Sequence, residues 1–249
     1  MIHGGVLKIA RFFCYVILTV LLAFTVAADA PKNFGEAKRL AKQIFQDNRV
    51  TFYCGCKYDK HSKIDINSCG YQVQHHPKRA RRLEWEHIMP VSLWGKEYPC
   101  WKEKLCCQKT HCYKGRTCCR KSNANFAKIE ADLHNLVPEI GELNGMRSNY
   151  RFGVLPHIAK GQVGACEFKI DHETRRVEPR NSVKGVIARA YLYMSDQYDI
   201  HLSKAQRQLF TAWDREFPPD AWEITWDNRV AAIQGNHNLY ISQYQSKQP

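Results

Sequence analysis

The feature that most limits the fold of this chain is its set of cysteines behind an apolar N-terminal run. Lys8 and Arg11 precede the apolar residues 12–28, which end in small side chains. A basic start, an apolar stretch and a small-residue end are typical of a secretory signal peptide, although an uncleaved anchor is the alternative. We therefore predict a signal peptide over residues 1–28 and one exported domain over residues 29–249, with no stable membrane association after cleavage.

Ten cysteines remain once the segment that contains Cys14 is set aside. An even number of cysteines in an exported chain predicts disulfides, here up to five, because thiols are oxidised outside the cytoplasm. The alternative is a zinc site of thiolate and imidazole ligands, with His111, within residues 100–119. Disulfides are favoured because this segment lacks paired CxxC spacings. The candidates are Cys54, Cys56, Cys69, Cys100, Cys106, Cys107, Cys112, Cys118, Cys119 and Cys166.

The chain is strongly basic, with a formal net charge of +13, of which Lys8 and Arg11 contribute two. A basic surface favours a polyanionic partner, and nucleic acid, acidic polysaccharide and anionic membrane all satisfy this condition. Simple solubility is the alternative, but it does not explain why positive charge is clustered in residues 78–82. The candidates for contacts to nucleic-acid phosphates are Lys78, Arg79, Arg81 and Arg82.

Hydrophobic periodicity predicts a helix-rich α+β domain with a small sheet. The predicted helices cover residues 34–45, a segment starting at a Ser122 cap, and residues 182–198, 203–217 and 220–233. Pro138 is predicted in the first turn of a further helix, where its missing N–H costs nothing. Alternating residues predict strands at 50–54 and 166–170. The lysine- and cysteine-rich residues 100–119 are predicted to form a loop held by disulfides.

A candidate site lies in residues 83–92, which read LEWEHIMPVS. A neutral imidazole at His87 can accept a proton near pH 7, and the adjacent Glu86 carboxylate can bind a divalent cation. A Glu-His pair alone is usually part of a solvated surface. Asn144, within GELNG, supplies a second hard oxygen ligand suited to Mg²⁺ or Ca²⁺. Its flanking glycines weaken a helix, each by ~1 kcal/mol relative to alanine, which indicates that another group approaches this backbone closely.

Four motifs that occur in order resemble the endonuclease I family of bacterial periplasmic and secreted nucleases, which belongs to the His-Me finger, or ββα-metal, class. They are EWEHIMPVS, GRTCC, DLHNLVPEIGELNGMRSN and GNHN, and the similarity extends from about Phe34 to Ile241. The resemblance implies a ββα-metal active site and a periplasmic or secreted location. It also implies a metal-dependent endonuclease that acts on DNA and RNA through their backbone phosphates, with little sequence preference, and leaves 5′-phosphates.

Carried onto matching positions, the resemblance implies roles for individual residues. His87 would be the general base, Arg116 would grip the scissile phosphate, and Glu86 and Asn144 would bind the metal. The implied cofactor is Mg²⁺, with Ca²⁺ or Mn²⁺ as alternatives. Three further residues are candidates for supporting positions beside these groups: Glu84, His134 and Asn135.

The chain also departs from the family pattern. Met146 stands where the family commonly has an acidic residue, and Ile224 and Tyr244 lie where some relatives carry a cysteine pair. A second functional class therefore stays open, in which a catalytically silent, disulfide-rich basic protein binds nucleic acid or acidic glycan. We expect a monomer in either case.

Overall fold

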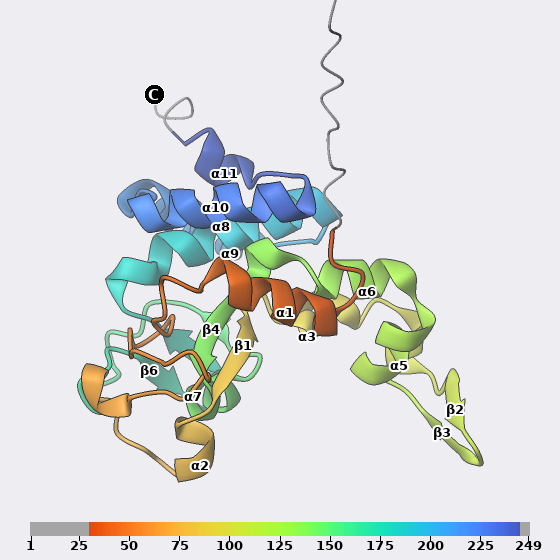
Figure 1. Ribbon diagram of the computed structural model, residues 1–249, viewed down its shortest axis with the longest axis horizontal. Helices are drawn as coiled ribbons and strands as arrows, with labels where there is room; N and C mark the ends of the chain where they lie inside the picture. The colour runs from red at the N-terminus through yellow and green to blue at the C-terminus, as the bar shows by residue number, and fades with distance from the viewer. Residues whose placement is uncertain (1–29, 245–249) are drawn as a thin grey trace, which may run out of the picture.

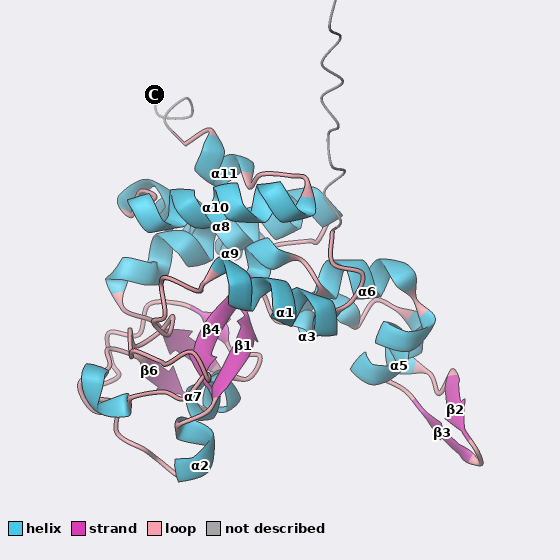
Figure 2. Cartoon of the chain, viewed as in Figure 1, coloured by secondary structure: helices cyan, strands magenta, loops and turns pink. Residues whose placement is uncertain are grey.

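Helices form most of the regular structure in this computed structural model, which describes residues 30–244 (Figure 1, Figure 2). Within this range the strands form three small sheets, with the orders β1-β4, β2-β3 and β5-β7-β6. The helix-rich α+β class is confirmed, although the sequence predicted one small sheet. No helix within residues 30–244 is long and apolar enough to cross a membrane. The predicted signal peptide, residues 1–28, lies outside the described residues.

The helices predicted for the C-terminal third are confirmed, and two of them start at the predicted caps. Ser203 and Gln206 form a reciprocal capping box. The Asp220 side chain accepts a hydrogen bond from the backbone N–H of Glu223. The Glu223 side chain does not complete a capping box with Asp220, because it pairs with the buried Arg189 instead. These helices lie along one side of the molecule (Figure 1). They are α8 (Asn181–Tyr198), α9 (Lys204–Glu216) and α10 (Ala221–Gln234), and the short helix α11 (Leu239–Ser242), which was not predicted, follows them.

Two helices nearer the N-terminus begin at asparagine caps. The Asn33 side chain accepts the N–H of Glu36 at 3.0 Å and starts α1 (Phe34–Ile44), as predicted. The cap predicted at Ser122 is wrong, because Ser122 ends α5 (Arg116–Ser122). Asn123 caps α6 (Ala124–Glu130) instead, by accepting the N–H of Phe126 at 2.8 Å.

The strand predicted over residues 50–54 is wrong. Val50 makes only an isolated bridge to Lys57, and the residues between them turn back on themselves, with the Thr51 N–H donating to the Cys56 carbonyl at 2.8 Å. The alternating residues Val50 and Phe52 are only partly buried, whereas Tyr53 between Phe52 and Cys54 is fully buried, so burial here does not follow the period of a strand. The strand predicted over residues 166–170 is shifted, since β6 covers Lys169–Asp171.

The sheet that carries the candidate site pairs β1 (Leu83–His87) with β4 (Leu136–Ile140) in antiparallel register. Pro138 lies within β4, opposite Trp85, so its predicted helical position is wrong. In a two-stranded sheet both strands are edges, and an edge tolerates the missing N–H of proline. The helix that follows, α7 (Gly141–Arg147), begins after β4 ends.

A cysteine arm, defined as residues 99–122, extends away from the rest of the chain (Figure 1). It is more structured than the predicted loop, because it contains α4 (Pro99–Lys102), β2 (Cys106–Gln108), β3 (His111–Tyr113) and α5. The predicted disulfides are confirmed and the zinc alternative is excluded, because all ten candidate thiols are paired. The pairs are Cys100–Cys119, Cys106–Cys118 and Cys107–Cys112 in the arm, with Cys54–Cys166 and Cys56–Cys69 elsewhere.

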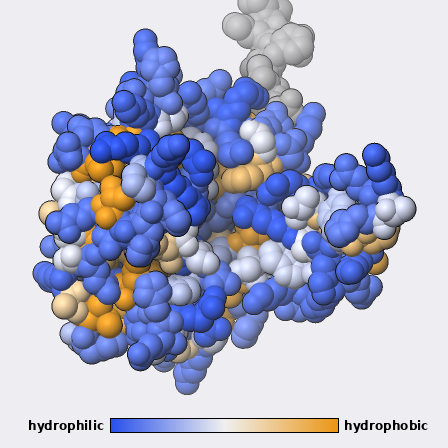
Figure 3. All heavy atoms as spheres, turned by 90° about the horizontal axis from the view of Figure 1, so that it is seen from below, coloured by the Kyte–Doolittle hydropathy of each residue, from blue (hydrophilic) through white to orange (hydrophobic). Residues whose placement is uncertain are grey.

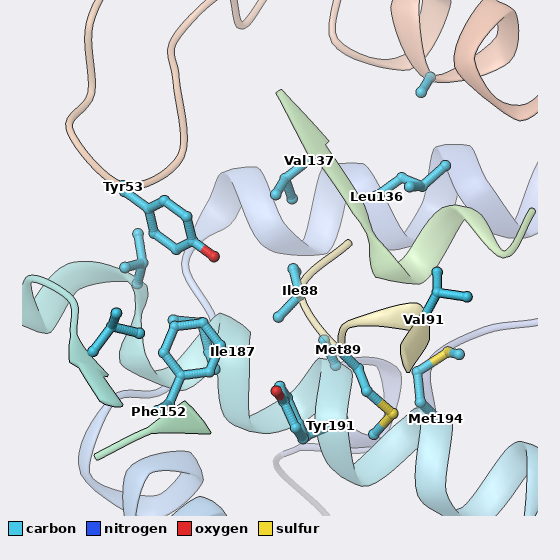
Figure 4. Packing of buried hydrophobic residues seen from close by; sticks show 14 of the residues in the cluster. Tyr53, Ile88, Met89, Val91, Leu136, Val137, Phe152, Ile187, Tyr191 and Met194 are labelled. Atoms are coloured by element: carbon cyan, nitrogen blue, oxygen red, sulfur yellow. The ribbon is translucent and has the colours of Figure 1, made fainter. Parts of the chain in front are cut away.

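The hydrophobic core holds the end of β1 in place. Ile88 and Met89, which directly follow β1, are fully buried and lie beside side chains of α8 such as Tyr191 and Met194 (Figure 4). The two residues that directly follow Glu86 and His87 are therefore anchored in the core. The remaining short elements are η1 (Ile66–Cys69), α2 (Pro77–Ala80), α3 (Val91–Gly95), η2 (Leu133–Asn135), β5 (Arg151–Phe152) and β7 (Arg176–Glu178).

Candidate active site

An open pocket of about 890 Å³ lies where β1, α7, the start of α1 and the cysteine arm meet. From below, the surface is hollowed between the arm and the rest of the molecule (Figure 3). The pocket brings together side chains that are far apart in the sequence. Its lining includes the four predicted residues Glu86, His87, Arg116 and Asn144.

The His87 ring is held by a different hydrogen-bond partner at each of its two nitrogens. His87 Nε2 lies 2.8 Å from the backbone oxygen of Glu130, an acceptor, so Nε2 carries the proton and Nδ1 keeps its lone pair. Arg116 Nη2 donates toward Nδ1 at 3.3 Å. Burial, reinforced by the charge of Arg116, lowers the pKa of His87 to about 3. The imidazole is therefore neutral near pH 7.

The Glu86 carboxylate is buried, with one of its oxygens engaged by two partners. Arg147 Nη1 lies 2.9 Å from Glu86 Oε1, and the Tyr53 hydroxyl donates to the same oxygen at 2.9 Å. Burial raises the pKa of Glu86, and the Arg147 charge opposes this effect without cancelling it. No partner of Glu86 Oε2 is found among residues 30–244.

Glu130, which the sequence analysis missed, positions two members of the site at once. Its backbone oxygen holds the His87 ring, while its carboxylate pairs with Arg116 and, at 2.6 Å, with Arg120. Burial alone would raise the pKa of Glu130, but the hydrogen bonds to Arg120 and Arg116 outweigh it and lower the pKa. A signal for this residue exists in the sequence, because Glu130 falls four positions after Phe126 on the apolar face of its helix.

Asn144 lies in α7, half-buried at the pocket wall. The close approach expected from its flanking glycines is present. A Cβ on Gly141 would lie 2.8 Å from the Arg79 carbonyl oxygen, and one on Gly145 would collide with the Arg79 guanidinium. Small residues at these two positions therefore let α7 pack directly against the segment that leads into β1.

The donors of this pocket fit a hard divalent cation that keeps much of its water. Within residues 30–244 there is no group of three or more His, Cys, Asp or Glu side chains arranged to hold a metal. Glu86 and Asn144 nevertheless line the same pocket. Mg²⁺ is commonly bound by one or two protein oxygens, several waters and substrate phosphate. One carboxylate and one amide are consistent with that pattern.

The other predicted residues divide into those that border the pocket and those that do not. Glu84 lines it and pairs with both Arg79 and Arg82. Asn135 braces the chain after β1 by accepting the N–H of Met89 and donating to its carbonyl. Arg79 also lines the pocket. The residues outside the pocket lining are Asn135, the basic residues Lys78, Arg81 and Arg82, and His134, whose Nε2 lies 2.9 Å from the Asn236 carbonyl oxygen.

A second buried carboxylate, that of Glu139 in β4, should make the free energy of unfolding depend on pH. In the described part of the chain, its oxygens accept only the backbone N–H groups of Tyr53 at 2.6 Å and Ile140 at 2.8 Å. Burial raises its pKa to about 8, so the folded state keeps a proton that the unfolded state has lost. We expect the free energy of unfolding to fall as pH rises from about 6.5 to about 8, by up to about 1.4 kcal/mol per pH unit.

Urea denaturation through this pH range measures that slope. The ordinary pKa of histidine, about 6.5, lies at the start of this window, where His87 is partly protonated in the unfolded state only and contributes a slope of the opposite sign. Comparison with a variant that differs only at Glu139 removes this contribution. Above the pKa of Glu139 both states have lost the proton, and the slope should level off. A Glu139→Gln variant should lack the slope, and a variant that retained it would contradict the assignment to Glu139.

Fold and site together define a class of protein. The described chain is a basic, disulfide-linked α+β structure whose pocket combines a neutral imidazole, a buried carboxylate, an amide and an arginine. Groups that can act as a base, as oxygen ligands and as a phosphate-binding cation, when gathered around one open pocket, are typical of enzymes that hydrolyse phosphate esters.

Comparison with known proteins identifies the family within that class. A profile of the Endonuclease I family matches residues 33–245, and the chain therefore belongs to this family of nucleases, as its motifs predicted. It is 44% identical to "Endonuclease-1" of Buchnera aphidicola subsp. Baizongia pistaciae (strain Bp), over 84% of this chain and 83% of that protein. It is 42% identical to an "Extracellular deoxyribonuclease" of Aeromonas hydrophila, over 89% and 96% of the two chains. A "Periplasmic deoxyribonuclease" of the same organism is 40% identical, over 90% and 91%.

Proposed function

We propose that the protein is an exported, Mg²⁺-dependent endonuclease of the His-Me finger class, which hydrolyses the phosphodiester bonds of DNA and RNA with little sequence preference. The observation that carries the proposal is the convergence of His87 Nδ1, Arg116 and Glu86 on one open pocket. Two antiparallel strands, β1 and β4, followed by α7 support the ββα assignment. The names of the Aeromonas relatives support DNA as a substrate and a location outside the cytoplasm.

His87 acts as the general base in this proposal. Nδ1 carries the lone pair because Nε2 donates to the Glu130 carbonyl, so Nδ1 takes the proton from the attacking water. The Glu130 carbonyl also favours the protonated ring that forms, since it keeps accepting from Nε2. Phe34, with its ring centroid 4.8 Å from that of His87, limits how far the imidazole can turn.

Glu86 Oε2 and the Asn144 amide oxygen would hold the cation. When bound, Mg²⁺, or alternatively Ca²⁺ or Mn²⁺, would stabilise the negative charge that develops on the phosphate and on the leaving 3′-oxygen. Because the bond from phosphorus to the 3′-oxygen breaks, the products carry 5′-phosphates. Arg116 also lines the pocket and can present planar donors to the phosphate. Its partner Glu130 keeps the guanidinium in place before substrate arrives.

The test compares cleavage with binding. Purified oxidised protein is incubated with plasmid DNA and with a long RNA, in Mg²⁺, in EDTA, and in EDTA followed by excess Mg²⁺. We expect cleavage of both substrates only when Mg²⁺ is free, and 5′-phosphate ends on the products. Binding without cleavage in Mg²⁺ would overturn the proposal in favour of a catalytically silent binder of nucleic acid or glycan.

A further inference from the structure

A second basic pocket adjoins the candidate active site. It has a volume of about 700 Å³ and shares three lining residues with the first pocket: Pro90, Ser92 and Asn149. Four cationic side chains line it, namely Lys96, Arg151, Arg175 and Arg176, all of them exposed. Among the residues that the structure describes, no aspartate or glutamate is part of its lining.

These four cations differ from the basic cluster that the sequence analysis singled out. In residues 78–82, both Arg79 and Arg82 are paired with the Glu84 carboxylate. Within residues 30–244, by contrast, none of the four cations of the second pocket is in an ion pair with a carboxylate. The Glu84 carboxylate therefore neutralises part of the positive charge of residues 78–82, whereas no carboxylate pairs with the four cations of the second pocket in the described residues.

The pairing of two strands places two of these cations opposite each other, which is electrostatically unfavourable when no anion is bound. β5 and β7 pair in parallel with Arg151 directly opposite Arg176. Like charges opposite each other on neighbouring strands repel and destabilise the pair. A bound anion that contacts both guanidinium groups removes this repulsion. The pairing is thus an independent indication that the pocket receives negative charge.

The third arginine links the two pockets physically. Arg175 Nη2 donates to Asn149 Oδ1 at 2.6 Å, and the Arg175 guanidinium carbon lies 5.0 Å from the centroid of the Tyr150 ring. Asn149 lines both pockets and follows α7, the helix that carries Asn144. Arg175 is therefore held against the junction, where a chain leaving the active-site pocket would pass.

We propose that Lys96, Arg151, Arg175 and Arg176 form a second phosphate-binding site, which holds the backbone of the same nucleic-acid chain beyond the scissile phosphate. This inference rests on the proposed nuclease function and deepens it. Contacts from such cations bind phosphates without reading bases. The site predicts that long substrates are favoured over those with a single phosphodiester, because only long chains reach both pockets.

The first experiment measures binding without cleavage. A His87→Ala background in EDTA is titrated with a fluorescent DNA duplex over a series of salt concentrations. Adding Arg151→Ala and Arg176→Ala should reduce the slope of log affinity against log salt by roughly 0.9 for each cation removed. The control replaces Lys42 and Lys128, which are exposed and line neither pocket, and should change the slope less. Equal slopes in the two double variants would overturn the proposal.

The second experiment uses cleavage by the otherwise wild-type protein in Mg²⁺. It compares kcat/KM for a long duplex with kcat/KM for bis(p-nitrophenyl) phosphate, which is too small to span both pockets. In the Arg151→Ala/Arg176→Ala variant this ratio should fall, through a rise in the duplex KM of roughly three- to tenfold. An unchanged ratio would overturn the second site while leaving the nuclease proposal intact. If the wild type cleaves neither substrate, the nuclease proposal fails, and the binding experiment still tests the second site.

Discussion

Replacing His87 with alanine should lower kcat for phosphodiester cleavage by about 10²- to 10⁴-fold, the usual contribution of a general base. The structural reason is that His87 lines the pocket with an unprotonated Nδ1, while Nε2 donates to the Glu130 carbonyl. Alanine removes the base and leaves that carbonyl without its donor, which costs about 1–3 kcal/mol of stability. The rate is therefore measured under conditions where circular dichroism shows the variant to be folded.

His134 provides a matched control for this prediction. It is also a buried histidine whose Nε2 meets a backbone carbonyl, in this case that of Asn236 at 2.9 Å, but it does not line the pocket. We expect His134→Ala to lower stability by a similar amount and to leave kcat of the folded protein near the wild-type value. Added imidazole should restore part of the activity of His87→Ala only. Equal losses of kcat in both variants would show that His87 acts through stability rather than as a base.

The sequence predicted elements whose signals are local and missed those determined by distant contacts. Asn33 and Ser203 mark helix starts because each cap acts on an N–H three residues away. The local sequence around Pro138 resembles a helix start, but it does not reveal that this segment pairs with another strand. Its neighbours pair with β1, more than fifty residues earlier, and that pairing decides the conformation. Tertiary contacts of this kind override local preference.

The residues of the candidate site also divide into those that sequence motifs predicted and those that only the fold reveals. The motifs identified Glu86, His87, Arg116 and Asn144, and the structure gathers all four around one pocket. The groups that orient them were not predicted, because Glu130 acts on His87 through a backbone oxygen, which every residue has. The second basic pocket was missed for a related reason: Lys96, Arg151 and Arg175 form no run in the sequence and meet only through the fold.

Arg147 was also missed, and it is the residue whose loss should destabilise the site most. Its buried guanidinium contacts three oxygens of one short segment: Glu86 Oε1 at 2.9 Å, the His87 carbonyl at 3.0 Å and the Ile88 carbonyl at 2.5 Å. It thereby ties the end of α7 to the end of β1 and balances the charge of Glu86. Removing one partner of a buried ion pair leaves the other charge uncompensated.

We expect Arg147→Met to lower the free energy of unfolding by about 3–5 kcal/mol at neutral pH. Without the arginine the pKa of Glu86 should rise further, so the loss should shrink as pH falls and the carboxylate takes up a proton. Urea denaturation followed by tryptophan fluorescence measures both effects. Arg147→Lys, which keeps the charge but cannot present a planar fork to three oxygens, should fall between the wild type and Arg147→Met.

A double-mutant cycle with Glu86→Gln separates the stranded charge from the lost backbone contacts. If the uncompensated carboxylate is the main cost, the double variant should be more stable than Arg147→Met alone, and its loss should no longer depend on pH. The part of the loss that remains then measures what the guanidinium contributes through the carbonyls of His87 and Ile88. Strict additivity of the two single changes would contradict the coupling, and would mean that Arg147 acts on the backbone of the site rather than on its carboxylate.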